Sequence, residues 1–313
     1  MRGIQSALEP AGVQAEQIAN LWTVFLIVTA IVYVVVMAFT IAALLRRRPA
    51  IVSNATSPAV RNTVSAAVGL TVLILFGLLT ASIFTTRGIA SVPDRAIQIA
   101  VTGKQWWWQV EYDDADKSKR ITTANEIVIP VGVPVTVHLR SSDVIHSFWV
   151  PSLHGKRDLI PGKRGQTLTF RADKPGVYRG QCAEFCGYQH ANMSLWVTAL
   201  PFADYARWIE ASRQPSRIPS TKTERKGQDV FMSSPCPLCH TIQGTAAGGK
   251  TGPDLTHFAS RRSIAAAMFP NRPGFLGGWI VDAQHLKPGS QMPSIPLQEQ
   301  ELQPLVTYLE SLK

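Results

Sequence analysis

Cysteine is scarce in this 313-residue sequence, and its placement is more informative than its number. The four cysteines form two close pairs, Cys182/Cys186 and Cys236/Cys239. Each pair has a histidine nearby, an arrangement typical of cofactor binding, so no cysteine is left for a structural disulfide. Charge is also limited, because Asp, Glu, Lys and Arg together make up 17% of the residues.

Strongly basic segments are absent as well, although the formal net charge is +10. The positive charge is spread along the chain, and no Lys/Arg-rich run is interleaved with aromatic residues after residue 90. Because such runs are typical of nucleic-acid-binding surfaces, we expect no nucleic-acid partner. A chain of this length has room for two or more domains.

Two long runs contain no charged residue, Leu21–Leu45 and Val64–Phe84. A hydrocarbon core of about 30 Å needs about 20 helical residues, so the runs predict two membrane spans, over 21–45 and 64–86. Arg46-Arg-Arg48 and Arg61 lie between the runs without an acidic residue, which predicts a cytoplasmic loop. Both termini would then lie outside, in the periplasm of a Gram-negative bacterium. A cleaved signal peptide fits poorly, because twenty largely polar residues precede the first run.

Residues 91–210 contain short β-type runs separated by turn signals, a spacing that predicts a sandwich or barrel rather than βαβ units. The runs are Ala96–Val101, Trp106–Tyr112, Glu126–Ile129, Val133–Leu139, Ile145–Val150, Thr167–Phe170, Val177–Gly180 and Ser194–Leu200.

Soft metal ligands are concentrated near the end of this region, where Cys182, Cys186, His190 and Met193 lie within twelve residues. Thiolate, imidazole and thioether groups favour copper or zinc, and the thioether favours a copper electron-transfer centre. A further ligand is needed, and His146 in a β-type run offers one. The alternative is a disulfide between the two cysteines with Met193 in the core.

Other residues of the region have competing interpretations. At least one of Trp106, Trp107 and Trp108 should fill the core, as strand aromatics usually do. His138 and His154 are interpreted as structural or surface residues rather than ligands. Three acidic residues on one turn either attract a basic electron donor or form an ordinary solvated turn. They are Asp113, Asp114 and Asp116.

A segment rich in Pro and Ser, residues 211–221, predicts a linker to a C-terminal domain. Cys236-Pro-Leu-Cys239-His240 follows it, and C-x-x-C-H is the signature of covalent haem c attachment, with His240 as an iron ligand. A redox C-x-x-C or half of a zinc site are the alternatives, but the βαβ context or the additional ligands are missing.

The sixth iron ligand is predicted to be Met292, which lies in a Pro- and Gly-rich turn before Pro293. Met268, His257 and His285 are the competing candidates. A short helix is expected over 227–233 and a terminal helix over 297–312, with Phe231 and Tyr308 in contact.

These motifs resemble subunit II of haem–copper cytochrome c oxidases. The resemblance rests on C-x-E-x-C-x3-H-x2-M from Cys182, D-V-x-H-S-x-x-V-P-S-L from Asp143, the Gly103–Trp108 segment and the Ile160–Arg164 segment, and it covers residues 15–210. The C-terminal domain, with Thr251-Gly-Pro-Asp-Leu255, resembles class I cytochromes c, where the proline carbonyl orients the haem-ligating histidine.

The resemblance implies a membrane-anchored multidomain chain. Residues 1–90 would hold a transmembrane hairpin, 91–210 a cupredoxin-like Greek-key sandwich, and 222–313 an all-α class I cytochrome c domain. It also implies a binuclear copper centre, CuA, bridged by the two thiolates of Cys182 and Cys186. His146 and His190 would each bind one copper, and Met193 and the backbone carbonyl of Glu184 would be weak axial ligands.

Further roles follow from the same resemblance. The Glu184 side chain would face a magnesium site shared with subunit I, and electrons would enter at Trp106. The family's glutamate at the start of the second span is missing from Val60–Val64, so we assign no proton-uptake residue.

The combination of domains resembles caa-type oxidases, in which the fused haem passes electrons from cytochrome c to CuA and then to subunit I. Oxygen is reduced to water there, and protons are pumped. The implied partners are subunit I, subunit III, cytochrome c or another periplasmic donor, and lipid of the bacterial inner membrane. Two alternatives stay open, the small subunit of a haem–copper nitric oxide reductase and a membrane-tethered electron shuttle or copper-binding assembly protein.

Overall fold

The computed structural model describes residues 5–46, 57–90, 96–114, 116 and 119–313. The chain divides into two compact units, one formed by Glu16–Ser91 and the other by Met1–Ala15 together with Val92–Lys313.

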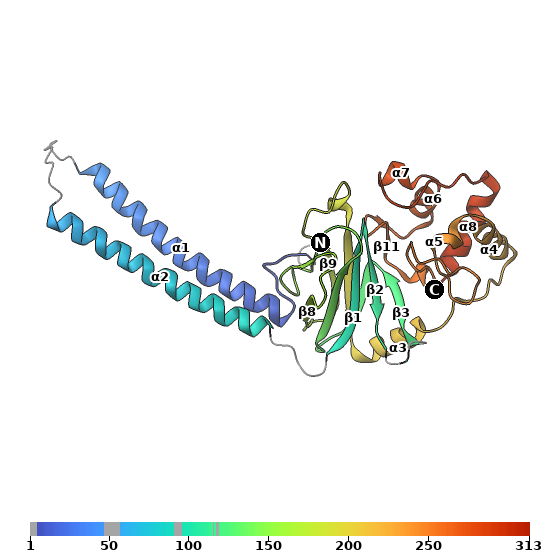
Figure 1. Ribbon diagram of the computed structural model, residues 1–313, viewed down its shortest axis with the longest axis horizontal. Helices are drawn as coiled ribbons and strands as arrows, with labels where there is room; N and C mark the ends of the chain where they lie inside the picture. The colour runs from blue at the N-terminus through green and yellow to red at the C-terminus, as the bar shows by residue number, and fades with distance from the viewer. Residues whose placement is uncertain (1–4, 47–56, 91–95, 115, 117–118) are drawn as a thin grey trace. The chain divides into compact units, whose positions relative to one another are not determined.

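The first unit contains α1 (Val13–Leu45) from Glu16 onward and α2 (Pro58–Ala90), drawn in blue and cyan in Figure 1. Their mean hydropathies reach 2.8 and 2.4 over an 18-residue stretch, and their apolar side chains are exposed. Both helices are therefore long and apolar enough to cross a membrane, as predicted. Each is longer than its uncharged run, because the helix continues into the polar flanks. Arg47 and Arg48 of the predicted cytoplasmic loop lie outside the described residues.

The second unit begins with a β-sandwich of two five-stranded sheets, which confirms the predicted cupredoxin-like fold. One sheet has the order β3-β2-β1-β5-β8, and the other has the order β4-β10-β9-β6-β7. The pairs β1/β5 and β4/β10 are parallel and the remaining pairs are antiparallel. The strands are β1 (Ile97–Lys104), β2 (Trp107–Tyr112), β3 (Ile121–Ala124), β4 (Glu126–Pro130), β5 (Val135–Ser141), β6 (His146–Trp149), β7 (Arg157–Leu159), β8 (Thr167–Phe170), β9 (Gly176–Cys182) and β10 (Ser194–Leu200).

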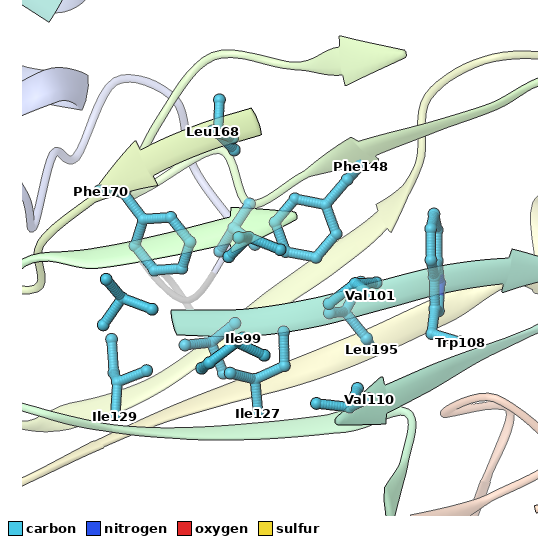
Figure 2. Close-up of a cluster of buried hydrophobic side chains, with 14 of the residues drawn as sticks. Ile99, Val101, Trp108, Val110, Ile127, Ile129, Phe148, Leu168, Phe170 and Leu195 are labelled. Atoms are coloured by element: carbon cyan, nitrogen blue, oxygen red, sulfur yellow. The ribbon is translucent and has the colours of Figure 1, made fainter. Parts of the chain in front are cut away.

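The core of the sandwich lies between the two sheets (Figure 2). Alternate residues of β1, Ile99 and Val101, are fully buried, as the two-residue period of a strand requires. Phe148 of β6 lies edge-on to Trp108 and stacks on Phe170, so three aromatic rings fill the space near one end. Burial of each large apolar side chain stabilises the folded state by about 1.5–3 kcal/mol. A core of this size makes the sandwich a stable support for the loops that connect its strands.

The C-terminal part is helical and consists of short helices around a second apolar cluster. Its elements are α4 (Lys222–Ser233), α5 (Cys236–Cys239), the 3-10 turn η3 (Phe258–Ser260), a small hairpin of β11 (Ser263–Ile264) and β12 (Phe269–Pro270), α6 (Pro273–Val281), α7 (Ala283–Leu286) and α8 (Glu299–Ser311).

Helices α4 and α8 cross closely, as cytochrome-type packing requires. A Cβ atom placed on Gly227 would lie 2.0 Å from the carbonyl oxygen of Pro304, so only glycine allows the approach. The predicted contact between Phe231 and Tyr308 is confirmed, with ring centroids 6.1 Å apart. Helix α4 begins at a capping box formed by Thr221 and Glu224, five residues before the predicted start.

The sequence did not predict strands β3 and β7 or helix α3 (Phe202–Ser212) in the sandwich part, nor the β11/β12 hairpin and helices α6 and α7 in the C-terminal part. Strand β7 has three residues, too few for a recognisable pattern, and forms because β6 supplies hydrogen-bonding partners. Helix α3 extends the copper-type domain to Ser212. Its Trp208 packs on Tyr112, with centroids 5.1 Å apart, so the helix covers the end of the sandwich.

Candidate metal centre and haem pocket

The soft side chains of the first cysteine pair converge at one end of the sandwich. Cys182 ends β9, and Met193 directly precedes β10, while Cys186 and His190 lie in the connection between the two strands. The backbone N–H of Cys182 donates to the carbonyl of Met193 over 2.8 Å, so the connection closes on itself. Within it, Gly187 has a φ of 107°, a left-handed conformation that glycine adopts without strain. The 3-10 turn η2 (His190–Asn192) then returns the chain to the sheet.

The potential ligand atoms lie within a few ångströms of one another. The two thiol sulfurs are 3.7 Å apart, Cys182 Sγ is 3.8 Å from Nδ1 of His146, and Cys186 Sγ is 3.6 Å from Nδ1 of His190. Met193 Sδ lies 3.9 Å from Cys186 Sγ, and the carbonyl oxygen of Glu184 lies 3.2 Å from Cys182 Sγ. The structure thus brings together every residue predicted for the copper centre.

The structure contains no disulfide between Cys182 and Cys186. Cys182 and Cys186 are free, and their 3.7 Å separation far exceeds the roughly 2.05 Å of a sulfur–sulfur bond. Cys182, Cys186 and His146 are buried and their ligand atoms lie within 4.8 Å of one another. A buried set of two thiols and imidazole nitrogens, with a thioether beside it, fits a soft metal such as copper.

His146 is held by a carboxylate that sequence reasoning did not single out. Its Nε2 lies 2.8 Å from Oδ1 of Asp143, so Nδ1 is the nitrogen that faces the thiols. The other oxygen of Asp143 accepts from the backbone N–H of Gln105 over 2.7 Å. A carboxylate on the second ring nitrogen fixes the orientation of a metal-binding histidine. Gly103 makes room for the ring, since a Cβ there would lie 2.7 Å from His146 Cδ2.

Proton binding by Cys182, Cys186 and His146 is coupled, because each group affects the pKa of its neighbour. Hydrogen bonding to Cys186 and to His146 lowers the pKa of Cys182, whereas the nearby Cys182 sulfur and burial raise the pKa of Cys186. Burial opposes the charged form of His146, but hydrogen bonds to Cys182 and Asp143 raise its pKa overall. The pair therefore favours one thiolate, and a bound cation would remove the second proton.

A cavity lies beside the C-x-x-C-H motif. Cys236, Cys239, His240 and Met292 all line it. Much of the remaining wall is apolar, which suits a flat macrocycle. The apolar residues include Leu255, Phe258, Ile264 and Ile295.

His240 is oriented as the cytochrome resemblance implies. Its Nδ1 lies 2.7 Å from the carbonyl oxygen of Pro253, which leaves Nε2 for an iron ion. A Cβ on Gly252 would lie 2.7 Å from His240 Cε1, so the neighbouring glycine permits this approach. Burial lowers the pKa of His240 and keeps the imidazole neutral, the form that binds iron. Cys236, Cys239, His240 and the cavity together fit a covalently attached haem.

Met292 is the candidate sixth ligand that lies in the cavity wall. The competing candidates Met268, His257 and His285 do not line it. His257 instead has its Nε2 3.0 Å from the carbonyl of Gln214. Gln284 donates to the carbonyl of Met292 over 2.6 Å and so fixes the loop backbone beside the thioether.

Trp106 lies between the two sites. It lines the cavity, and its Nε1 donates to the carbonyl of Cys186 over 2.9 Å. The side chain of Gln105 donates to the same carbonyl over 2.8 Å. Trp108 is fully buried in the core, so one of the three tryptophans packs as predicted.

The remaining predicted residues lie apart from both sites. His138 is within 2.7 Å of Gln98 Oε1 and His154 is within 3.1 Å of the carbonyl of Gly155, as structural histidines would be. The Glu184 side chain is exposed. The three acidic residues of the turn each pair with a cation of the same chain, which favours the solvated-turn interpretation. The pairs are Asp113–Arg120, Asp114–Arg213 and Asp116–Lys119.

Sequence reasoning missed Asp143 and Lys287. Asp143 stands three residues before His146, and a carboxylate close to a ligand histidine was a usable signal. Lys287 gave no signal, because its burial depends on two parts of the chain meeting.

Comparisons with known proteins show which families the two soluble parts of the chain are similar to. Residues 97–200 match the family described as "Cytochrome C oxidase subunit II, periplasmic domain", and residues 224–313 match the family "Cytochrome c". Cytochrome c oxidase subunit 2 of Alkalihalophilus pseudofirmus is 35% identical, over 98% of this chain and 91% of that protein. The protein of the same name from Bacillus sp. strain PS3 is 31% identical, over 77% of this chain and 72% of that protein.

A solved structure is also similar to part of the chain. It is the periplasmic domain of subunit II of cytochrome oxidase from Bradyrhizobium japonicum, 31% identical, with a TM-score of 0.36. The similarity covers 39% of this chain and 97% of that one.

Proposed function

The chain belongs to the cytochrome c oxidase subunit 2 family, and from that premise we propose that electrons enter a respiratory haem–copper oxidase through it. They would pass from cytochrome c to the chain's own haem c, then to a binuclear copper centre, and then to subunit I. Oxygen would be reduced to water in subunit I with proton pumping. Haem c and copper, when bound, supply one-electron transfer.

The observation that carries this proposal is the position of Trp106. One indole lines the haem cavity and donates a hydrogen bond to the backbone of a copper-ligand candidate, Cys186. Two redox sites in one chain therefore share a wall, which supports transfer between them. The same indole would be the point where electrons reach the copper centre.

The proposed copper ligands divide between the two ions as the family resemblance implies. The thiolates of Cys182 and Cys186 would bridge the ions, with His146 and His190 as one nitrogen ligand each. Met193 and the Glu184 carbonyl would complete the set from the axial positions. The convergence of all six groups in the sandwich supports this assignment.

The proposed haem is attached through Cys236 and Cys239, with His240 and Met292 on the iron. The cavity that all four line supports the assignment. The exposed carboxylate of Glu184 would offer one ligand to a magnesium ion at the boundary with subunit I.

The two apolar helices make the chain a membrane-anchored protein. We propose that it lies in the bacterial inner membrane with both termini and the soluble domains on the outer face. The arginine-rich segment between the spans would then face the cytoplasm, as the positive-inside rule requires. Subunit III and membrane lipid would be further partners.

The test uses the assembled oxidase with the full-length chain. Oxygen uptake driven by reduced cytochrome c is measured for the natural protein and for Cys186→Ser, with His138→Ala as the control. We expect Cys186→Ser to abolish uptake while the haem c spectrum is unchanged, and His138→Ala to behave as the natural protein. Full activity in Cys186→Ser, or nitric oxide consumption in place of oxygen uptake, would overturn the proposal.

A further inference from the structure

A single buried lysine joins the haem-bearing part of the chain to the copper-bearing part. Lys287 has 2% of its surface exposed, although lysine is rarely buried without a partner. Its Nζ donates to three backbone carbonyls, those of Trp106 at 2.9 Å, Asn192 at 2.8 Å and Ala265 at 3.0 Å. An ammonium group has three donors, so each one has an acceptor.

The three acceptors belong to segments that matter for both centres. Trp106 stands between the haem cavity and Cys186, and Asn192 directly precedes the candidate ligand Met193. Lys287 itself begins the loop that carries Met292. The side chain therefore ties the loop of the candidate iron ligand to the two backbone segments nearest the copper ligands.

Burial lowers the pKa of Lys287 to about 7, which reflects the cost of removing the ammonium from water. The three carbonyl oxygens offset this desolvation cost only while the C-terminal part of the chain contacts the sandwich, because two of them belong to the sandwich part. If the parts separated, the carbonyls of Trp106 and Asn192 would lose this donor. The arrangement therefore depends on contact between the two parts and also favours it.

The surrounding contacts continue the same interface. Gln189, beside the candidate ligand His190, donates to the carbonyl of Pro288 over 2.9 Å. The backbone N–H of Ser194 donates to the carbonyl of Ala266 over 3.1 Å, and Trp196 donates to Ser263 over 3.0 Å.

Backbone strain occurs at the same place. Ala265, Ala266 and Ala267 have φ values of 53°, 62° and 63°, a left-handed conformation that costs energy for residues other than glycine. The carbonyls of Ala265 and Ala266 are the ones that face Lys287 and Ser194. Strain that persists because the surroundings fix it often marks a functional contact.

We propose that Lys287 is a positioning residue, which locks the haem loop against Trp106 and Asn192 and so sets the geometry for electron transfer between the two centres. This inference rests on the proposed function. Lys287 acts through its backbone contacts and does not itself carry electrons or bind either cofactor.

The test compares Lys287→Met with Lys226→Met, an exposed lysine on α4, in the full-length chain loaded with copper and haem. Two quantities are measured: the rate of electron transfer from photoreduced haem to copper, and the pulsed-EPR distance distribution between the oxidised centres. Lys287→Met should disfavour the arrangement in which the haem loop contacts Trp106 and Asn192 by about thirtyfold, the factor that corresponds to two lost hydrogen bonds of ordinary strength. We expect a slower transfer phase and a broadened distance distribution, with the optical spectra of both centres unchanged.

A second variant keeps the inference testable if Lys287→Met does not fold. Glu126 accepts hydrogen bonds from the backbone N–H groups of Arg262, at 2.6 Å, and Ser263, at 3.3 Å, at the other end of the interface. Glu126→Ala should broaden the distances and slow transfer in the same way. Unchanged rates and distances in loaded Lys287→Met, or in loaded Glu126→Ala where the lysine variant does not fold, would overturn the inference. A natural chain that binds no copper or no haem would overturn the proposed function instead.

Discussion

The indole Nε1 of Trp106 donates a 2.9 Å hydrogen bond to the backbone carbonyl of Cys186. The bond joins a residue of the haem cavity to the loop that holds the copper-ligand candidates. The C-terminal part of the chain supplies most of the other residues that line this cavity.

Replacing Trp106 with Phe should slow electron transfer between the two centres. The variant loses the hydrogen bond to Cys186 and the larger indole ring, and we expect a decrease on the order of tenfold, equivalent to about 1.4 kcal/mol. Flash reduction of the haem followed at the copper absorption band measures the rate. Trp208→Phe is the matched control, because Trp208 of α3 packs on Tyr112 of β2 and does not line the cavity. Equal rates in both variants would contradict a role for Trp106.

Replacing Met292 with Leu should lower the reduction potential of the haem iron and change its ferric spin state. Loss of the thioether removes the proposed sixth ligand, and because His/Met ligation raises the potential, the variant should have a lower one. Redox titration and the spin state of the ferric haem provide the measurements. Met268→Leu serves as control because Met268 does not line the cavity. If Met268→Leu lowers the potential and Met292→Leu does not, the ligand assignment is wrong.

Replacing Asp143 with Asn should weaken copper binding without abolishing it. The variant keeps the shape but removes the carboxylate that lies 2.8 Å from Nε2 of His146. Removing such a partner typically costs about 10- to 100-fold in metal affinity. Competition with a chelator measures the affinity, and Asp204→Asn, in the first turn of α3, should leave it unchanged. Natural affinity in Asp143→Asn would contradict this role of the carboxylate.

Glu224 should make the stability of the haem domain depend on pH. Backbone hydrogen bonds from Ser220 and Thr221, together with Arg217, lower the pKa of its carboxylate in the folded chain. The stabilisation is therefore complete above the unfolded pKa of about 4.3 and is lost as the pH falls through the folded value.

Glu224→Gln keeps a side chain that can form the capping box but removes the charge. At pH 7 we expect a loss of about 1 kcal/mol in the free energy of unfolding, as for an ion pair with one exposed partner, here Arg217. Denaturant unfolding followed at the haem band should show this difference shrinking in acid. A difference that grows as the pH falls would contradict the assignment.

The sequence predicts local motifs well because each one depends on residues close together in the chain. The Cys182–Met193 segment, the C-x-x-C-H motif and the two apolar runs all carry their chemistry within short spans. His146 was the distant ligand candidate for the copper centre, and it was suggested by a β-type run together with the family resemblance.

The features that escaped prediction depend on contacts between distant parts. Lys287 reads as an ordinary surface lysine, and only the fold brings Trp106, Asn192 and Ala265 around its Nζ. Strand β7 and helix α3 likewise depend on neighbours, β6 and Tyr112. Spacing within a sequence does not contain such information.

The measurement that tests the central claim most directly is the metal content and copper EPR spectrum of the full-length chain, purified in detergent after copper and haem are supplied. We predict two coppers and one iron per chain, with hyperfine coupling shared over two copper nuclei. Cys182→Ser should lose the shared coupling and keep the iron. A single localised copper in the natural chain, or no copper at all, would contradict the account.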